Sequence, residues 1–274
     1  KDVQDPSKDQ LNSLISLYNQ KKLQQVFNET QRLTKQYTKS LVLWNLMGAS
    51  AIQIGKPDEA ALAFQNTISI KPDDAGAYNN MGNALKKQGK LEEAIEAFNK
   101  ALSIKPDIAE AYYNMGVTLK DQGKLEEAIK ACKKGISIKP DDAGAYSNMG
   151  NILKDQGKLE EAIETYNKAL SIKPDYAPAI LQIGRSLKKL GQADESIKYF
   201  EQALSLDPED TLGAELELVL LGQKNIPPKT PQTYMADFYK KRSTRWDKDN
   251  NYNGHVLIKN AFSSLITAPD KMDI

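Results

Sequence analysis

The chain has 274 residues, and its 37 lysine and arginine residues nearly balance its 36 aspartate and glutamate residues, leaving a net charge of +1. This balance argues against a strong surface field for nucleic acid. No apolar run reaches the ~20 residues that span a bilayer, and the start, KDVQDPSKDQ, lacks the apolar core of a signal peptide. With one cysteine, Cys132, and one histidine, His255, little material remains for a disulfide, a metal site or histidine-based catalysis. We therefore expect a soluble, cytoplasmic protein with no cofactor, no metal, and no nucleic-acid or membrane partner.

Residues 1–40 are expected to form a degenerate pair of helices. Leu11, Leu14 and Leu17 mark an apolar side of the first half, and Val26 and Phe27 mark one in the second. An irregular pair is typical of the end of a repeat array, because a terminal unit has one neighbour and needs a polar outer face.

A 34-residue pattern fills residues 41–210. The stretch AYNNMGNALKKQGKLEEAIEAFNKALSIKPD begins at Ala77, and close copies begin at Ala111 and Ala145. A fixed period of this length indicates one supersecondary unit that is stacked on copies of itself. The five units are 41–74, 75–108, 109–142, 143–176 and 177–210.

Each unit is expected to hold two helices. Apolar residues at positions four, seven, eight and eleven predict one face of a first helix, helix A, which a glycine at position fifteen ends. LEEAIEAF-like patterning predicts helix B, and small residues at positions eight and twenty, such as Gly116 and Ala128, would let the helices approach closely. A proline at position thirty-two stops helix B. The aspartates that follow are expected to cap the next helix A, namely Asp73, Asp107, Asp141 and Asp175.

These features resemble the tetratricopeptide repeat (TPR), and the resemblance covers about residues 41–210. It implies an all-α fold, a right-handed α-solenoid of antiparallel helix pairs. In the family, helix A lines a concave groove, and the proteins act through protein–protein interaction.

One stripe of helix A, at positions two, six, nine and thirteen, lies opposite the predicted core face. The resemblance therefore places this stripe in the groove. It is rich in primary amides, which offer both donors and an acceptor to a peptide backbone. Lysines at position twelve border it and favour an acidic partner, or are solvated side chains paired with Asp121 and Asp155. The candidate peptide-binding residues are Asn80, Asn83, Lys86, Asn114, Lys120, Asn148, Asn151, Lys154, Gln182 and Arg185.

Two binding modes of the family can be compared with this stripe. The column Asn80, Asn114 and Asn148 resembles the asparagine ladder of O-linked N-acetylglucosamine transferases, which holds extended polypeptide. The match fails at Leu46 in the first unit and is only approximate at Gln182 in the fifth. The same asparagines are common in idealised repeats as a solvated face. A basic clamp for a C-terminal carboxylate is disfavoured, because apolar or uncharged residues such as Tyr113 stand at groove positions that would need charge.

After residue 210 the period is lost. Residues 211–222 are expected to form a capping helix, 223–231 a proline-rich linker, and 232–274 two further helices. The last segment is similar to the entry segment of class I S-adenosylmethionine-dependent methyltransferases that follow TPR arrays in some bacterial proteins. No glycine-rich cofactor loop is present, so this chain would not itself be catalytic.

The sequence thus supports a protein-interaction scaffold that binds an extended or helical peptide. The alternative is the substrate-recruiting N-terminal region of a larger methyltransferase, and a glycosyltransferase arm rests on the asparagine column alone. Near-identical units also offer a route to self-association through the solenoid ends.

Overall fold

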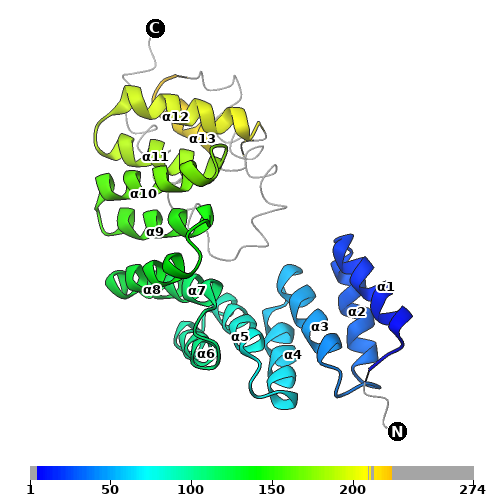
Figure 1. The fold of residues 1–274 in the computed structure, drawn as a ribbon. Coiled ribbons are helices and arrows are strands. Elements are labelled where there is room, and N and C mark those ends of the chain that lie inside the picture. The colour runs from blue at the N-terminus through cyan, green and yellow to red at the C-terminus, as the bar shows by residue number, and fades with distance from the viewer. Residues whose placement is uncertain (1–4, 209, 211–212, 224–274) are drawn as a thin grey trace. The chain divides into compact units, whose positions relative to one another are not determined.

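The computed structural model describes residues 5–208, 210 and 213–223, which all belong to the first of two compact units, residues 1–228. These residues form thirteen helices and no strand (Figure 1). The predicted linker from residue 224 and the predicted helices of 232–274 lie outside the described residues. The described part is an all-α solenoid, as the repeat pattern predicts.

The helices follow one another in regular pairs. Helix A of the five units is α3, α5, α7, α9 or α11, and helix B is α4, α6, α8, α10 or α12. The helices are α1 (Lys8–Asn19), α2 (Leu23–Leu33), α3 (Leu41–Gln53), α4 (Pro57–Ile70), α5 (Ala75–Lys87), α6 (Leu91–Ile104), α7 (Ala109–Asp121), α8 (Leu125–Ile138), α9 (Ala143–Asp155), α10 (Leu159–Ile172), α11 (Ala177–Lys189), α12 (Ala193–Leu206) and α13 (Ala214–Leu220).

Each helix packs mainly on its neighbours along the chain, and successive helices A from α3 to α11 also touch one another. Within a unit helices A and B come into close contact at position eight. A Cβ atom on Gly82 would lie 2.6 Å from Cε1 of the fully buried Phe98. No residue larger than glycine therefore fits here without a shift of the ring, which explains why helices A and B meet at this point.

The helix ends show why the unit is 34 residues long. Helix α5 ends at Lys87, and Gly89 takes a positive φ of 78°, a conformation that glycine adopts at little cost. Helix α6 then runs to Ile104, just before Pro106, where proline stops it as predicted.

The predicted N-caps were wrong by one position. The side chain of Asp74 accepts a hydrogen bond from the backbone N–H of Ala77 (3.0 Å), and Asp142 does the same for Ala145 (3.2 Å). Asp73 and Asp141 instead lie in the turn that follows the proline, so the cap falls on the last residue of the unit. In the other two units the N-caps are Ile108 and Tyr176, which make no side-chain cap, so Asp107 and Asp175 cap nothing there.

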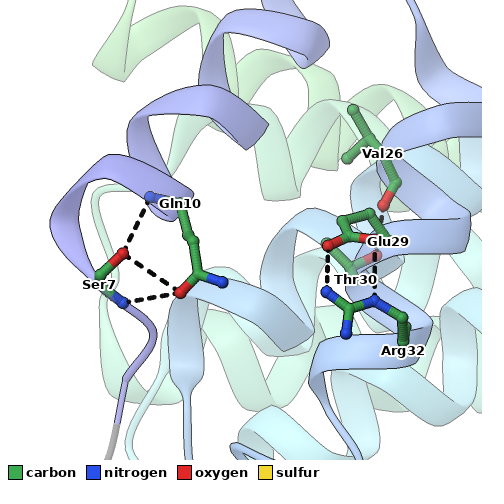
Figure 2. A network of polar contacts seen from close by, with 6 residues as sticks. All are labelled: Ser7, Gln10, Val26, Glu29, Thr30 and Arg32. Carbon is green, nitrogen blue, oxygen red and sulfur yellow. Dashed lines mark hydrogen bonds and ion pairs between the residues drawn. The ribbon is translucent and has the colours of Figure 1, made fainter.

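The N-terminal pair α1 and α2 keeps the 34-residue register. Lys21, one period before Gly55, has a positive φ of 61° and occupies the place of the helix-ending glycine. Helix α1 begins with a capping box, in which Ser7 Oγ accepts from the Gln10 N–H (3.3 Å) and Gln10 Oε1 accepts from the Ser7 N–H (3.1 Å) (Figure 2). The same view shows the Glu29–Arg32 ion pair on the exposed side of α2. Local capping thus replaces the glycine and proline signals of the later units.

Candidate functional site

The candidate site is a stripe along helices α5, α7, α9 and α11, which we call the amide face. Its members are the ten half-buried residues Asn80, Asn83, Lys86, Asn114, Lys120, Asn148, Asn151, Lys154, Gln182 and Arg185. Two hydrogen bonds join one helix A to the next across this face. Asn114 Nδ2 donates to Asn79 Oδ1 (3.1 Å), and Lys154 Nζ donates to Gln182 Oε1 (2.7 Å). Side chains that are far apart in the sequence therefore share one polar surface.

Some amides of this face already have partners. Asn151 Oδ1 accepts a hydrogen bond from the hydroxyl of the buried Tyr166 (2.8 Å), which ties Asn151 to helix B of its own unit. Asn114 donates its hydrogen bond to Asn79, whose side chain is buried and only 4% exposed. Both bonds fix the orientation of an amide and leave its other groups for a ligand.

Other amides are open. Within the described residues, the side chains of Asn80, Asn83 and Asn148 make no hydrogen bond. They lie on α5 and α9, the helices A of the second and fourth units. Donors and acceptors that are half-buried but unpartnered gain most from an incoming peptide, because part of their desolvation has already occurred.

Two lysines of position twelve, Lys86 and Lys154, are partly desolvated by burial. Burial lowers the pKa of Lys86, and Asp121 only partly offsets this. Burial likewise lowers the pKa of Lys154, although the charge of Asp155 acts in the opposite direction. The predicted pairing with Asp121 is made by Lys120, at 3.5 Å. A carboxylate that approached Lys86 or Lys154 would favour the charged form that burial disfavours.

The C-terminal end of the amide face is covered by α13. Arg185 Nε donates to Glu217 Oε1 (2.8 Å), and Lys188 Nζ donates to Glu217 Oε2 (2.7 Å). Burial raises the pKa of Glu217, but the charge of Arg185 and the hydrogen bond from Lys188 outweigh it, so the net pKa is lowered. Arg185 is thus already engaged by an acidic side chain. Glu217 was not among the predicted site residues, since its only signal in the sequence is a charge inside the apolar stretch TLGAELELVLL.

Tyr113 does not lie in the groove, and that prediction was wrong. The side chain is only 8% exposed, and its hydroxyl donates to the backbone carbonyl of Lys139 (3.1 Å). Asn79, at the same position of the second unit, is buried as well. Tyr113 therefore gives no reason to disfavour a basic clamp.

The described part of the chain was also compared with other kinds of site. A cavity of about 600 Å³ lies among α4, α5 and α6, with Tyr78, Met81 and Leu85 in its lining, and so belongs to the opposite side of helix A. Residues 5–208, 210 and 213–223 contain no group of three histidine, cysteine, aspartate or glutamate side chains suited to a metal. None of the thirteen described helices combines the length and the apolar character required to cross a bilayer.

Comparison with protein families finds the repeat in one continuous region. A family model described as "TPR repeat" matches residues 50–89, 82–123 and 150–191, and models described as "Tetratricopeptide repeat" match residues 109–142, 131–164 and 177–210. Together these matches run without a gap from residue 50 to residue 210, more than half of the chain. A search of curated proteins finds no match.

Solved structures show the same fold. A crystal structure of MamA is 27% identical, with 63% of this chain and 94% of that chain covered and a TM-score of 0.52. The PilF structure from Pseudomonas aeruginosa is 16% identical, with 78% and 96% covered and a TM-score of 0.63. YrrB, described as a TPR protein with an unusual peptide-binding site, is 16% identical, with 69% and 97% covered and a TM-score of 0.51. The methyltransferase resemblance concerns residues outside the described part, and these comparisons give it no support.

Proposed function

This chain belongs to the tetratricopeptide repeat family, and we propose that it is a non-catalytic scaffold whose amide face binds a peptide segment of a partner protein. In this proposal five repeats over residues 41–210 form the binding region, with α1 and α2 at its N-terminal end and α13 at its C-terminal end. The observation that carries the proposal is the continuity of the amide face. Hydrogen bonds connect α5 with α7 and α9 with α11, and within the described residues the side chains of Asn80 and Asn148 have no hydrogen-bond partner.

The chemistry of such a row suits a polypeptide backbone. A backbone presents one donor and one acceptor at each residue, and a primary amide can satisfy both. Each such bond adds only ~0.5–1.5 kcal/mol net, so affinity would come from the row and not from a single contact. The lysines Lys86, Lys120 and Lys154 beside it would favour a segment with carboxylates.

The fold itself supports this assignment. A stacked helical array exposes an extended surface along which many short contacts can be made. YrrB, which shares the fold, is described as having a peptide-binding site, although the likeness at 16% identity concerns the fold alone.

A selection experiment tests the proposal. The whole chain is immobilised and exposed to a displayed library of random 16-residue peptides, and enriched sequences are synthesised for fluorescence anisotropy. The double variant Asn80→Ala/Asn148→Ala should weaken binding of these peptides by about tenfold, the loss of two hydrogen bonds. Asn114 is left intact, because its removal would also orphan the buried Asn79.

A matched control removes two asparagines from helix B of the same units, away from the amide face. Asn99 and Asn167 lie on α6 and α10, in the same two units, and are exposed on helix B. The double variant Asn99→Ala/Asn167→Ala should bind the selected peptides as the unaltered chain does. Equal losses in the two double variants, or loss only in the control, would refute the amide face as the binding site.

A further inference from the structure

Exposed apolar side chains extend the amide face at its N-terminal end. Ile15 is 43% exposed and Val42 is 39% exposed, and they lie on α1 and α3. In the register of the repeat they hold positions nine and two, which belong to the same stripe of helix A as Asn83 and Asn151 at position nine. With the half-buried Leu46 at position six, they form what we call the apolar end.

The apolar end comprises one side chain on α1 and two on α3. Leu46 packs with Leu11 against one buried cluster, and Ile15 follows Leu11 by one helical turn. Val42 precedes Leu46 by one turn on α3. The two helices are also joined on this side by a hydrogen bond from Gln53 Nε2 to the Tyr18 hydroxyl (2.6 Å). The apolar end therefore draws on two helices, α1 and α3, that this hydrogen bond connects, and both belong to the N-terminal end of the stack (Figure 1).

The chemistry of the stripe changes between α3 and α5. Position six changes from Leu46 to Asn80, and position twelve changes from Ile52 to Lys86. The lysine column then continues through Lys120 and Lys154. One surface thus joins an apolar section on α1 and α3 to a section with amides and positive charge on α5, α7 and α9.

Lys188, the last lysine at position twelve, already forms an ion pair with an acidic side chain. Glu217 binds Lys188 and Arg185 at 2.7 and 2.8 Å, although α13 brings it there inside a largely apolar helix. This contact shows, within the described part of the chain, which chemistry the basic side chains of this face accept. In the earlier units Lys120 lies 3.5 Å from the Asp121 carboxylate, and Lys154 donates to the neutral amide of Gln182 (2.7 Å).

We propose that the partner segment is bipartite, with apolar side chains that pack on Ile15, Val42 and Leu46 and carboxylates that pair with Lys86, Lys120 and Lys154. This inference rests on the proposed peptide binding at the amide face. Packed helices lie ~8–10 Å apart, and an extended chain advances ~3.3 Å per residue, so each repeat accommodates roughly three residues. The carboxylates should therefore lie about three to nine residues from the apolar side chains.

The library of random 16-residue peptides also tests this inference. Selection on the unaltered chain should enrich peptides that carry an apolar cluster and an acidic cluster at that separation. Selection on Ile15→Gln/Val42→Gln should keep the acidic cluster and lose the apolar one, and the original peptides should bind this variant about tenfold more weakly. Both positions are exposed, so the variant should fold, which circular dichroism and an unchanged melting temperature would verify.

The control removes an apolar side chain elsewhere. Leu62 is 59% exposed on α4, outside the stripe, and Leu62→Gln should leave both selection and affinity unchanged. If the enriched peptides lack an apolar cluster, or if Ile15→Gln/Val42→Gln binds them normally, the bipartite inference is wrong while sensitivity to Asn80→Ala/Asn148→Ala would still uphold the amide face. If no peptide is enriched, both proposals fail.

Discussion

The ring of Tyr113 lies against the α-carbon of Gly135, so that a Cβ atom on residue 135 would come within 2.3 Å of the ring. The two residues belong to helices A and B of the third unit, where they are exceptions to the pattern. The fourth unit has the small Ser147 in place of the tyrosine and Ala169 in place of the glycine. A large residue on one helix is thus matched by the absence of a side chain on the other.

The contact between Tyr113 and Gly135 predicts that the effect of Gly135→Ala on the free energy of unfolding changes sign when Tyr113 is replaced by a small residue. Gly135→Ala should lower the free energy of unfolding by ~1–3 kcal/mol through overpacking, because Tyr113 is buried and held by Lys139. In the Tyr113→Ser background the same change should raise it by ~1 kcal/mol, since alanine is the better helix former. Urea unfolding of the four chains measures both effects. A Gly135→Ala effect that does not depend on residue 113 would contradict the contact.

The glycine at position eight of the same unit should also tolerate no side chain. A Cβ atom on Gly116 would lie 2.7 Å from Cys132 Sγ and 3.2 Å from the Ala128 carbonyl. Gly116→Leu should therefore force the two helices apart and cost more than the ~1–3 kcal/mol of ordinary overpacking. Gly76→Ala is the control, because only Asp74 Oδ1, at 3.3 Å, is near. An unchanged melting temperature for Gly116→Leu would be incompatible with the helix register.

Gln122 is a site where a polar residue weakens the fold. Both polar atoms of its side chain are buried without a hydrogen-bond partner among the described residues, while the same position holds Ile54 in the first unit and Leu190 in the fifth. Gln122→Leu should raise the free energy of unfolding by ~1–3 kcal/mol, the desolvation cost of an unpaired group. Gln88→Leu should gain less, since Gln88 Nε2 donates to the Pro57 carbonyl (3.2 Å). Thermal unfolding that ranks Gln88→Leu above Gln122→Leu would contradict this reading.

Glu217 makes the C-terminal cap sensitive to acid. Because its pKa is lowered in the folded state, its contribution is complete above its unfolded pKa of about 4.3 and disappears as the pH falls through the folded pKa. Glu217→Gln should lower the free energy of unfolding at pH 7 by ~1–3 kcal/mol, because Arg185 and Lys188 lose a charged partner. The difference between the two chains should shrink below about pH 4.3. Urea titrations at neutral and acidic pH measure it, and a constant difference would exclude the ion pairs.

The reactivity of the single cysteine, Cys132, measures how tightly the core around it is closed. Burial raises the pKa of Cys132 to about 12, so at pH 8 almost no thiolate is present to react. A thiol reagent should leave the native chain unmodified and label one equivalent after unfolding in urea. Rapid labelling of the native chain would show that the contact between α7 and α8 is open.

Much of the fold could be predicted from the sequence, because the period and its glycines and prolines act locally. Helix A ends where Gly89 takes a positive φ, and helix B ends before Pro106, both through short-range effects. The cap at Asp74 was misplaced by one residue because the turn geometry after proline decides which aspartate faces the helix. The placement of the ten candidate residues on one face followed from helical spacing alone.

The rest depended on contacts between units, which spacing does not describe. Tyr113 was expected in the groove, but a neighbouring Gly135 gives it room in the core. Glu217 pairs with Arg185 across 32 positions of sequence, and Asn114 pairs with Asn79 across 35. Nothing local distinguishes these residues from solvated ones. Their partners are known only once the units are stacked.

Nuclear magnetic resonance of the side-chain amides is the most direct test of the amide face. The ¹⁵N-labelled chain is titrated with a selected 16-residue peptide, with amide signals assigned through single Asn→Ala variants. The account predicts shifts at Asn80 and Asn148 and none at Asn99 and Asn167. Shifts confined to Asn99 and Asn167 would place the partner on helix B and contradict the account.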